Sequence, residues 1–258
     1  MGNSGLICYT KLSPNHSGQR THAIDRITPH CVVGQLSCET ICDCFPAGRN
    51  ASCNYGIGKD GCISLCVEEK NRSWCSSSNA NDQRAVTIEC ASDKSEPYAM
   101  TNAVYTSLVK LCVDICKRNG KKKLLWFGDK AKTLAYNPAA DEMVITVHRW
   151  FANKSCPGNW LYSRLGDLAA QVTAQLSGSN GTSGSAGFPA TPFQVRVIVS
   201  DLNIRKQPCM ENNTTGKYTG KGMFTIVEVK DGWGKLKSGA GWIWLKNSNY
   251  CTVLNTVG

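Results

Sequence analysis

Hydrophobic and polar positions alternate along residues 84–92 (RAVTIECAS) as they do in a β-strand. Successive side chains of a strand point to opposite faces of a sheet, so a period of two predicts strand structure. Residues 22–33 (HAIDRITPHCVV) and 142–150 (EMVITVHRW) are also predicted to be strands. All three segments precede residue 176.

Helical patterns separate these strands. We expect a helix over residues 36–45 with Ser37 capping its start, and a second helix over residues 96–120 with Pro97 in its first turn and an Asn-Gly end. A third helix is predicted over residues 160–176. The expected core-facing stripes are Val104, Leu108, Leu111 and Ile115 in the second helix, and Leu161, Leu165, Leu168 and Val172 in the third. Alternating strands and helices predict an α/β domain, residues 1–176, with helices flanking a central mixed sheet.

The pattern changes after residue 176. Residues 177–192 are rich in Gly and Ser and predict a flexible linker. Residues 193–258 contain short strand patterns and predict a small all-β barrel or sandwich. The expected hairpin turns are Asp231-Gly232 and Ser238-Gly239.

The chain of 258 residues carries a net charge of +10. Its last part is the more basic per residue, with nine lysines and arginines against four acidic residues in 176–258. Such a surface attracts nucleic acid, anionic lipid or bacterial wall polymers, and charge alone does not choose among them. The first residues, MGNSGLICYTKL, lack a secretory signal pattern, and no stretch is long and apolar enough to span a membrane. We expect synthesis in the cytoplasm without a signal peptide.

The 15 cysteines are an odd number, and many recur at a near-helical spacing of four, such as the pairs 38/42, 62/66 and 112/116. A chain of this length needs no disulfides to build a core. We expect most cysteines to be reduced thiols in the core, with an additional structural zinc site as the alternative.

The four histidines are few enough to be informative, and two of them, His30 and His148, lie on predicted strands. Cys156 follows His148 by eight residues in HRWFANKSCPG. A catalytic zinc site needs three protein ligands and an open position. His30, His148 and Cys156 are suitable donors, and a core histidine with a buried thiol is the alternative. Strand alternation predicts that Cys31 points away from His30.

Four segments, ITPHCVVG, NYGIGKDG, RAVTIEC and HRWFANKSCPG, resemble in order the type-2 N-acetylmuramoyl-L-alanine amidases of phage endolysins and bacterial autolysins, which are related to peptidoglycan recognition proteins. The resemblance covers about residues 8–176. It implies peptidoglycan as the substrate and a Zn²⁺ cofactor. The implied zinc ligands are His30, His148 and Cys156, and the implied catalytic residues are Glu89, Lys154 and Tyr55.

These residue types suit amide hydrolysis. Zinc polarises a carbonyl and lowers the pKa of a bound water from 15.7 to about 7. Glu89 is expected to transfer the proton, Lys154 to stabilise the oxyanion, and Tyr55 to donate a hydrogen bond to it or to position the substrate. Trp74, Trp150 and Trp160 are expected either to line the groove or to pack in the core. The rival interpretations are a binding-only receptor of the same fold, which the presence of Cys156 disfavours, and a peptidase that cuts another amide of the stem or cross-bridge.

Residues 193–258 resemble a bacterial SH3-type module through VIVSDLNIRKQP, GKYTGKGMFTIVEVKDGWGKL and GWIWL, although Cys209 and Met210 depart from the usual pattern. The resemblance implies binding to the cell wall. The candidate binding aromatics are Trp233, Trp242, Trp244 and Tyr218, which are equally suited to the core of a small barrel. We expect a monomer that acts at the bacterial cell wall after release by a holin or by lysis, with no nucleic acid or membrane partner.

Overall fold

The structure is a computed structural model that describes residues 2–177, 188–208, 214–230, 232–245 and 250–254. The chain divides into two compact units, Met1–Ser179 and Asn180–Gly258. Residues 178–187 of the predicted linker, and also Cys209 and Met210, lie outside the described residues.

Within residues 2–177, seven strands form one mixed sheet in the order β1-β4-β3-β5-β2-β7-β6. All neighbours run parallel except β3 and β4, which are antiparallel. The strands are β1 (Ile7–Thr10), β2 (Arg26–Cys31), β3 (Tyr55–Ile57), β4 (Ile63–Leu65), β5 (Ala85–Cys90), β6 (Lys123–Leu125) and β7 (Glu142–Ile145). This confirms the predicted α/β class, and β2 lies buried between β5 and β7.

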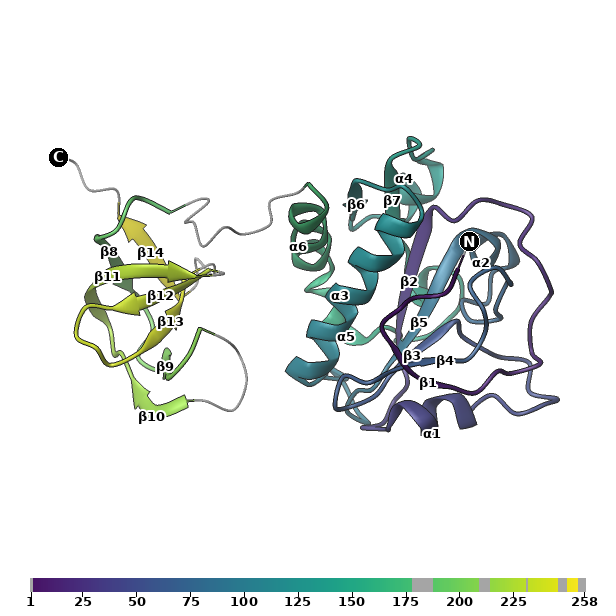
Figure 1. Ribbon diagram of the computed structural model, residues 1–258, viewed down its shortest axis with the longest axis horizontal. Helices are drawn as coiled ribbons and strands as arrows, with labels where there is room; N and C mark the ends of the chain where they lie inside the picture. Colours follow the sequence, from purple (N-terminus) through teal and green to yellow (C-terminus); the bar gives the residue numbers. More distant parts are fainter. Residues whose placement is uncertain (1, 178–187, 209–213, 231, 246–249, 255–258) are drawn as a thin grey trace. The chain divides into compact units, whose positions relative to one another are not determined.

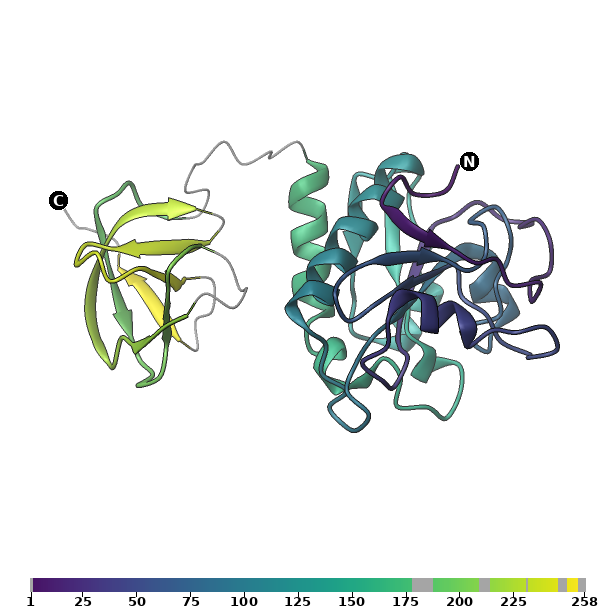
Figure 2. The same cartoon turned by 60° about the horizontal axis from the view of Figure 1, so that its bottom comes forward.

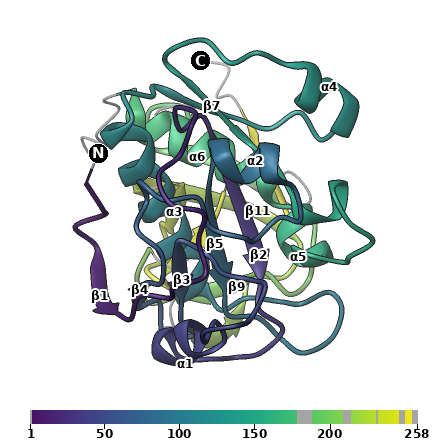
Figure 3. The ribbon, with the colours of Figure 1, turned by 90° about the vertical axis from the view of Figure 1, so that its right-hand side faces the viewer.

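The helices of this unit are α1 (Cys38–Asp43), α2 (Asn79–Arg84), α3 (Asn102–Arg118), α4 (Lys130–Ala135), the 3-10 helix η1 (His148–Trp150), α5 (Gly158–Tyr162) and α6 (Leu165–Leu176). Helices α3 and α6 lie side by side over one face of the sheet (Figures 1 and 2). Both predicted apolar stripes are fully buried there, which confirms them. Helices α1 and α2 lie at opposite ends of the strands (Figure 3).

The long helix α3 begins later than predicted. Thr101 is its N-cap, and the Thr101 side chain accepts a hydrogen bond from the N–H of Val104. A side-chain oxygen at this position satisfies an N–H group that the first turn leaves free. Pro97 therefore lies in the preceding loop, and its predicted place in the first helical turn is wrong. Asn119 follows the last helical residue, as the Asn-Gly signal predicted.

Two other predicted elements are shorter than expected. Strand β7 ends at Ile145, and the chain turns at η1, where the N–H of Phe151 donates to the carbonyl of His148 over 2.9 Å. The predicted helix 160–176 is two helices. Arg164 separates them because its guanidinium donates to the carbonyl of Trp160 over 2.8 Å, which caps the end of α5.

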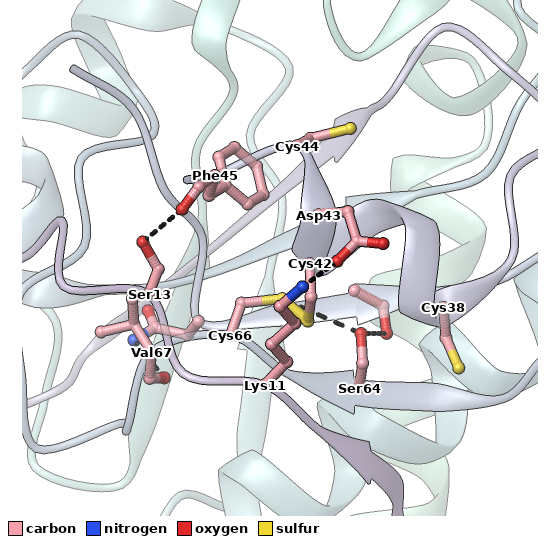
Figure 4. The surroundings of a disulfide bond; sticks show 12 residues. Lys11, Ser13, Cys38, Cys42, Asp43, Cys44, Phe45, Ser64, Cys66 and Val67 are labelled. Carbon is pink, nitrogen blue, oxygen red and sulfur yellow. Dashed lines mark hydrogen bonds and ion pairs between the residues drawn. A yellow bond between two sulfur atoms is a disulfide. The ribbon is translucent and has the colours of Figure 1, made fainter. Parts of the chain in front are cut away.

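The cysteines only partly follow the prediction. Ten described cysteines are free, which agrees with the expectation that most cysteines are reduced thiols. Four others form two disulfides, Cys8–Cys62 and Cys42–Cys66. Figure 4 shows the second of these between α1 and the end of β4. Cys62 and Cys66 flank a strand, so their spacing of four does not mark a helix.

Within the described part of the second unit, seven strands form an antiparallel sheet in the order β10-β9-β13-β12-β11-β8-β14. They are β8 (Phe193–Val197), β9 (Asn203–Arg205), β10 (Thr214–Tyr218), β11 (Gly222–Lys230), β12 (Trp233–Leu236), β13 (Trp242–Trp244) and β14 (Cys251–Leu254). The pairing of β11 with β12 and of β12 with β13 confirms that both predicted segments form hairpins. Asp231 of the first turn lies outside the described residues. A separate core forms around Phe193, Val195, Ile226 and Ile243.

None of the described helices has the length and apolar character needed to cross a membrane.

Candidate active site

The histidine of β2 is buried in the middle of the sheet. His30 is 0% exposed, and the parallel pairing of β2 with β5 places it beside Glu89. Residues paired in this way project from the same face of a sheet, and His30 Nδ1 lies 4.0 Å from Glu89 Oε1. Burial, followed by the nearby His148, lowers the pKa of His30 well below its usual value. The ring is therefore neutral, which is the form that binds metals.

The second histidine is held by a turn and not by a strand. His148 opens η1, and its ring centroid lies 5.1 Å from that of His30. Its Nε2 makes a 2.9 Å hydrogen bond with Ser77 Oγ. This bond fixes the ring and leaves Nδ1 as the free nitrogen. Burial, followed by the charge of Lys154, lowers the pKa of His148.

Cys156 joins the two histidines. Its Sγ lies 3.3 Å from His30 Nδ1, and one donor atom from each of His30, His148 and Cys156 lies within 4.8 Å of the others. The segment between His148 and Cys156 folds back on itself, because the N–H of Arg149 donates to the carbonyl of Cys156 over 3.1 Å. Two imidazoles and one thiolate are donors that zinc prefers. The three residues predicted as ligands are thus brought together.

Cys31 influences the cluster without belonging to it. A hydrogen bond with Cys31, followed by burial, raises the pKa of Cys156. The regular register of β2 with β5 pairs His30 with Glu89 and Cys31 with Cys90, so the two side chains alternate as predicted. Cys31 is not among the residues whose donor atoms come together.

Two buried polar atoms at the site lack a hydrogen-bond partner among the described residues. They are His30 Nε2 and Glu89 Oε2. Buried polar atoms are normally satisfied by protein groups, water or an ion. Together with the imidazole and thiolate donors, the unsatisfied Glu89 Oε2 fits a site that holds a zinc ion and its water. His30 Nε2 lies on the other edge of the ring from Nδ1, the nitrogen beside Cys156.

Glu89 lies against the cluster with little access to solvent. Its side chain is 15% exposed, and burial raises its pKa to about 7. A carboxyl group with such a pKa can both accept and donate a proton near neutral pH. This environment differs from that of a solvated strand carboxylate.

The structure adds Cys75 to the site. Its Sγ lies 3.7 Å from Glu89 Oε1, and it forms a second group of close donor atoms with His30 and Glu89. The loop is held by Asp82, whose Oδ2 accepts from the N–H of Cys75 over 3.0 Å. No pattern predicts Cys75, because it lies in an irregular loop where neither strand nor helix periodicity applies.

Lys154 is an exposed residue next to the cluster. Its N–H donates to the carbonyl of Ala152 over 2.8 Å, within the turn that leads to Cys156. Its positive charge contributes to the lowered pKa of His148, which indicates that the ammonium lies near the ring.

Tyr55 does not join the cluster. The register of β3 with β5 places it on the face opposite to Glu89. Its buried hydroxyl donates to Glu69 Oε1 over 2.6 Å and accepts from the N–H of Ser4 over 2.9 Å. Glu69 in turn forms an ion pair with Arg118 of α3. The prediction that Tyr55 takes part in the reaction is wrong, because its hydroxyl belongs to a buried network under α3.

A cleft of about 520 Å³ adjoins Ser77, the residue that bonds His148, and its lining does not include the cluster residues themselves. Ser77, Lys130, Trp150 and Phe151 are among the residues that line it. Trp150 is also stacked against Trp126, with ring centroids 5.2 Å apart, so it serves both the cleft and the core. The cation of Lys130 and the aromatic rings give the cleft both a charged and an apolar side.

The other two predicted tryptophans of this unit are half-buried. Trp74 donates its indole N–H to Ser17 Oγ over 2.7 Å, and Trp160 packs under the guanidinium of Arg164 at 4.2 Å. Neither residue lines the cleft that adjoins Ser77.

The second unit has a pocket of its own, with a volume of about 240 Å³. Its lining includes Asp201, Arg205, Trp233, Trp244 and Tyr250. It therefore combines one carboxylate, one guanidinium and three aromatic rings in a small space. Such concave sites with few polar groups are typical of small-ligand binding.

Two of the four candidate binding aromatics of this unit line the pocket, and two do not. Trp233 and Trp244 line the pocket, with ring centroids 5.1 Å apart. Trp242 is buried at 8% exposure, whereas Tyr218 is 59% exposed and lies outside the pocket lining.

Comparison with known proteins places this geometry in a wider context. The family model described as N-acetylmuramoyl-L-alanine amidase matches residues 20–159. No curated protein matches the chain. Similar solved structures include that of PlyL, with 14% identity over 64% of this chain and 95% of that chain and a TM-score of 0.45. An AmpD derivative has 17% identity, 63% and 94% coverage and a TM-score of 0.44. Staphylococcus aureus hydrolase AmiA in complex with its ligand has 12% identity, 67% and 86% coverage and a TM-score of 0.45.

Proposed function

Because the family model spans more than half of it, the chain belongs to the N-acetylmuramoyl-L-alanine amidase family, and from this premise we propose that it is a zinc-dependent peptidoglycan hydrolase. The bond that it cuts is the amide between N-acetylmuramic acid and the L-alanine of the stem peptide. Residues 1–176 form the proposed catalytic domain. The observation that carries the proposal is the meeting of His30, His148 and Cys156 within 4.8 Å.

The ligand assignment rests on the donor atoms. His30 offers Nδ1, which already lies 3.3 Å from the sulfur of Cys156, and His148 offers the nitrogen that Ser77 leaves free. Zinc bound by these donors supplies a Lewis acid that activates water and polarises the amide carbonyl. Neutral imidazoles in a buried setting suit this role, since burial lowers the pKa of both histidines.

Glu89 is the proposed proton carrier. Its carboxylate takes a proton from the attacking water and delivers it to the nitrogen of the leaving L-alanine. Burial raises its pKa to about 7, which brings it close to the pH at which both transfers are efficient. The thiol of Cys75, which contacts Oε1, helps to orient the carboxylate.

Lys154 is the proposed oxyanion partner. Its ammonium is exposed and lies near the ring of His148. A positive charge at this place stabilises the negative charge that develops on the carbonyl oxygen during attack. The adjacent cleft with Trp150 and Lys130 is the proposed path of the glycopeptide.

The second unit is the proposed wall anchor. We assign residues 193–258 to an SH3-type module and residues 177–192 to a linker that joins it to the amidase. The pocket beside Trp233 and Trp244 supports a binding role, as does the excess of basic residues in this part of the chain. In this proposal the protein is made in the cytoplasm, acts as a monomer on the wall after release, and causes lysis.

The decisive experiment is analysis of the products of purified cell walls. The proposal predicts new amino-terminal alanine, intact glycan strands and no new reducing ends. Another new amino terminus would instead indicate cleavage elsewhere in the stem or cross-bridge. Wall binding without any new terminus would indicate a receptor and would reject the hydrolase.

A further inference from the structure

Five cysteines meet where α1 packs against β4 and β1. Two disulfides, Cys8–Cys62 and Cys42–Cys66, use four of them. Cys38 is left as a thiol, one helical turn before Cys42 on α1 (Figure 4). This group of sulfurs lies outside the proposed zinc cluster and has no part in the proposed hydrolysis.

The remaining thiol contacts one of the disulfides directly. Cys38 Sγ lies 2.8 Å from Cys62 Sγ. The sulfur atoms of Cys8, Cys38 and Cys62 all lie within 4.8 Å of one another. Thiol–disulfide exchange requires a thiolate next to a disulfide sulfur, and this arrangement places the two reactants in contact.

The surroundings of the three sulfurs make Cys8 the accessible one. Cys38 is buried, whereas Cys8 is exposed on the edge strand β1. The N–H of Ile63 donates to Cys8 Sγ over 3.0 Å, and the Ile63 carbonyl oxygen lies 3.4 Å from the same sulfur. The nearer group is the donor, which stabilises negative charge on a leaving sulfur.

We propose that Cys8, Cys38 and Cys62 form an exchange site that exposes Cys8 to modification by small disulfides. In the first step the sulfur of Cys38 bonds to that of Cys62, the Cys62–Cys8 bond breaks, and the electron pair leaves on Cys8. The proton lost by Cys38 is taken up by Cys8, so no net oxidation occurs. In the second step Cys8 loses this proton, its thiolate attacks a small disulfide and forms a mixed disulfide, and the released thiolate takes up the proton.

The exchange is slow at neutral pH for a physical reason. Burial, followed by the charge of Glu39 and then that of Asp60, raises the pKa of Cys38 to about 11. Most of this thiol is therefore protonated at pH 7, and the attacking thiolate is scarce. The protein can accordingly be isolated with the Cys8–Cys62 bridge and the Cys38 thiol side by side.

Native alkylation of the full chain at pH 9 tests the exchange. The chain is incubated with iodoacetamide for increasing times and is then digested with a protease at acid pH. Mass spectrometry of the peptides shows whether each cysteine is alkylated or disulfide-bonded. We expect Cys8 to be labelled progressively while a Cys38–Cys62 linked peptide appears in equal amount. Cys38→Ser should slow the labelling of Cys8 at least tenfold, whereas Cys44→Ser, which removes another free thiol of the same region, should leave the rate unchanged. Equal labelling of Cys8 in the Cys38→Ser variant, or absence of the linked peptide from the unchanged chain, overturns the proposal.

A second variant tests the proposal even if Cys38→Ser does not fold. Cys8→Ser removes the exposed partner and should be recovered from glutathione buffer with Cys38 and Cys62 joined. Recovery with both residues as free thiols overturns the proposal. The mixed-disulfide step is read separately, as the mass of glutathione added to Cys8 when oxidised glutathione replaces iodoacetamide. Addition at Cys8 that requires Cys38 supports the step, and its absence rejects it.

Discussion

The sulfur of Cys156 lies 3.3 Å from Nδ1 of His30, although 126 residues separate them along the chain. The contact arises because β2 and β7 are neighbours in the sheet and the segment after β7 turns back at η1. Burial lowers the pKa of His30, and a hydrogen bond with Cys31, followed by burial, raises the pKa of Cys156. A neutral imidazole therefore faces a neutral thiol at neutral pH, and this contact supports the proposed metal site.

Removal of the metal should abolish hydrolysis. We expect chelation to stop the release of amino-terminal alanine from purified walls, and stoichiometric zinc to restore it. Cys156→Ser should lose zinc, as measured by elemental analysis, because a hydroxyl is a much weaker ligand than a thiolate. Cys251→Ala, which removes a thiol from the other unit, should retain zinc. Full turnover in protein shown to be free of metal would reject the zinc mechanism.

Glu89→Gln should separate the chemistry from the metal site. The amide cannot take a proton, so turnover should fall by ~10²–10⁴, the usual share of general acid–base catalysis. Zinc content and far-UV circular dichroism should stay unchanged, because the substitution keeps the size of the side chain. Near-normal turnover of this variant would remove Glu89 from the mechanism.

The same substitution should change how stability depends on pH in the chelated protein. Burial raises the pKa of Glu89 from 4.5 to about 7, so the folded state holds this proton more tightly than the unfolded state. Stability should therefore fall as pH rises from 4.5 to 7, by up to about 3 kcal/mol at about 1.4 kcal/mol per pH unit. Glu89→Gln should be more stable than the unchanged chain at pH 8 and equal to it at pH 4. Urea unfolding at both pH values measures this, and equal stability at pH 8 would contradict the buried carboxylate.

Tyr55→Phe should affect stability and not turnover. The hydroxyl donates to Glu69 and accepts from Ser4 in a buried place, so its loss leaves polar groups unsatisfied at a cost of about 1–3 kcal/mol. The turnover of the folded protein should stay within about twofold of normal. A loss of turnover without a loss of stability would return Tyr55 to the catalytic site.

Ser77→Ala should weaken the metal site through His148. The hydroxyl holds Nε2 of this ring at 2.9 Å, and loss of such an outer contact typically lowers metal affinity ~10–100-fold. Competition with a chromogenic chelator measures the affinity. Ser95→Ala, at an exposed position of the same unit, is the control for loss of a hydroxyl, and its zinc affinity should stay unchanged. Ser78 does not suit this purpose, because its side chain caps the start of α2. Equal zinc affinity in the Ser77 and Ser95 variants would show that the contact does not position His148.

Deletion of residues 193–258 should leave hydrolysis of a small soluble muropeptide unchanged, because every proposed catalytic residue precedes this segment. Lysis of intact cells should weaken, since a linked binding module raises the effective concentration at the wall. The isolated module should pellet with purified sacculi at low salt and be partly released at 1 M salt, where the Debye length falls to ~3 Å. Failure to pellet with walls from several Gram-positive species would reject the wall anchor.

The sequence alone predicted much of this protein. The period of two in 84–92 identified β5, and the apolar stripe of α3 identified its buried face, because both patterns are set by local backbone geometry. The three proposed zinc ligands were found from the scarcity of histidine and from ordered motifs. Both hairpins of the second unit followed from Gly after Asp or Ser.

Only the tertiary structure decided which residues surround the site. Tyr55 was separated from Glu89 by the sheet, and Cys75 was brought to it by a loop, because strand register and loop packing depend on contacts between distant segments. The same holds for the sulfurs. The spacing of four between Cys62 and Cys66 is typical of a helix. In the structure, the packing of β1 and α1 against β4 places Cys62 between Cys8 and Cys38. Local patterns carry no information on such contacts, since burial is shared among elements that meet only after folding.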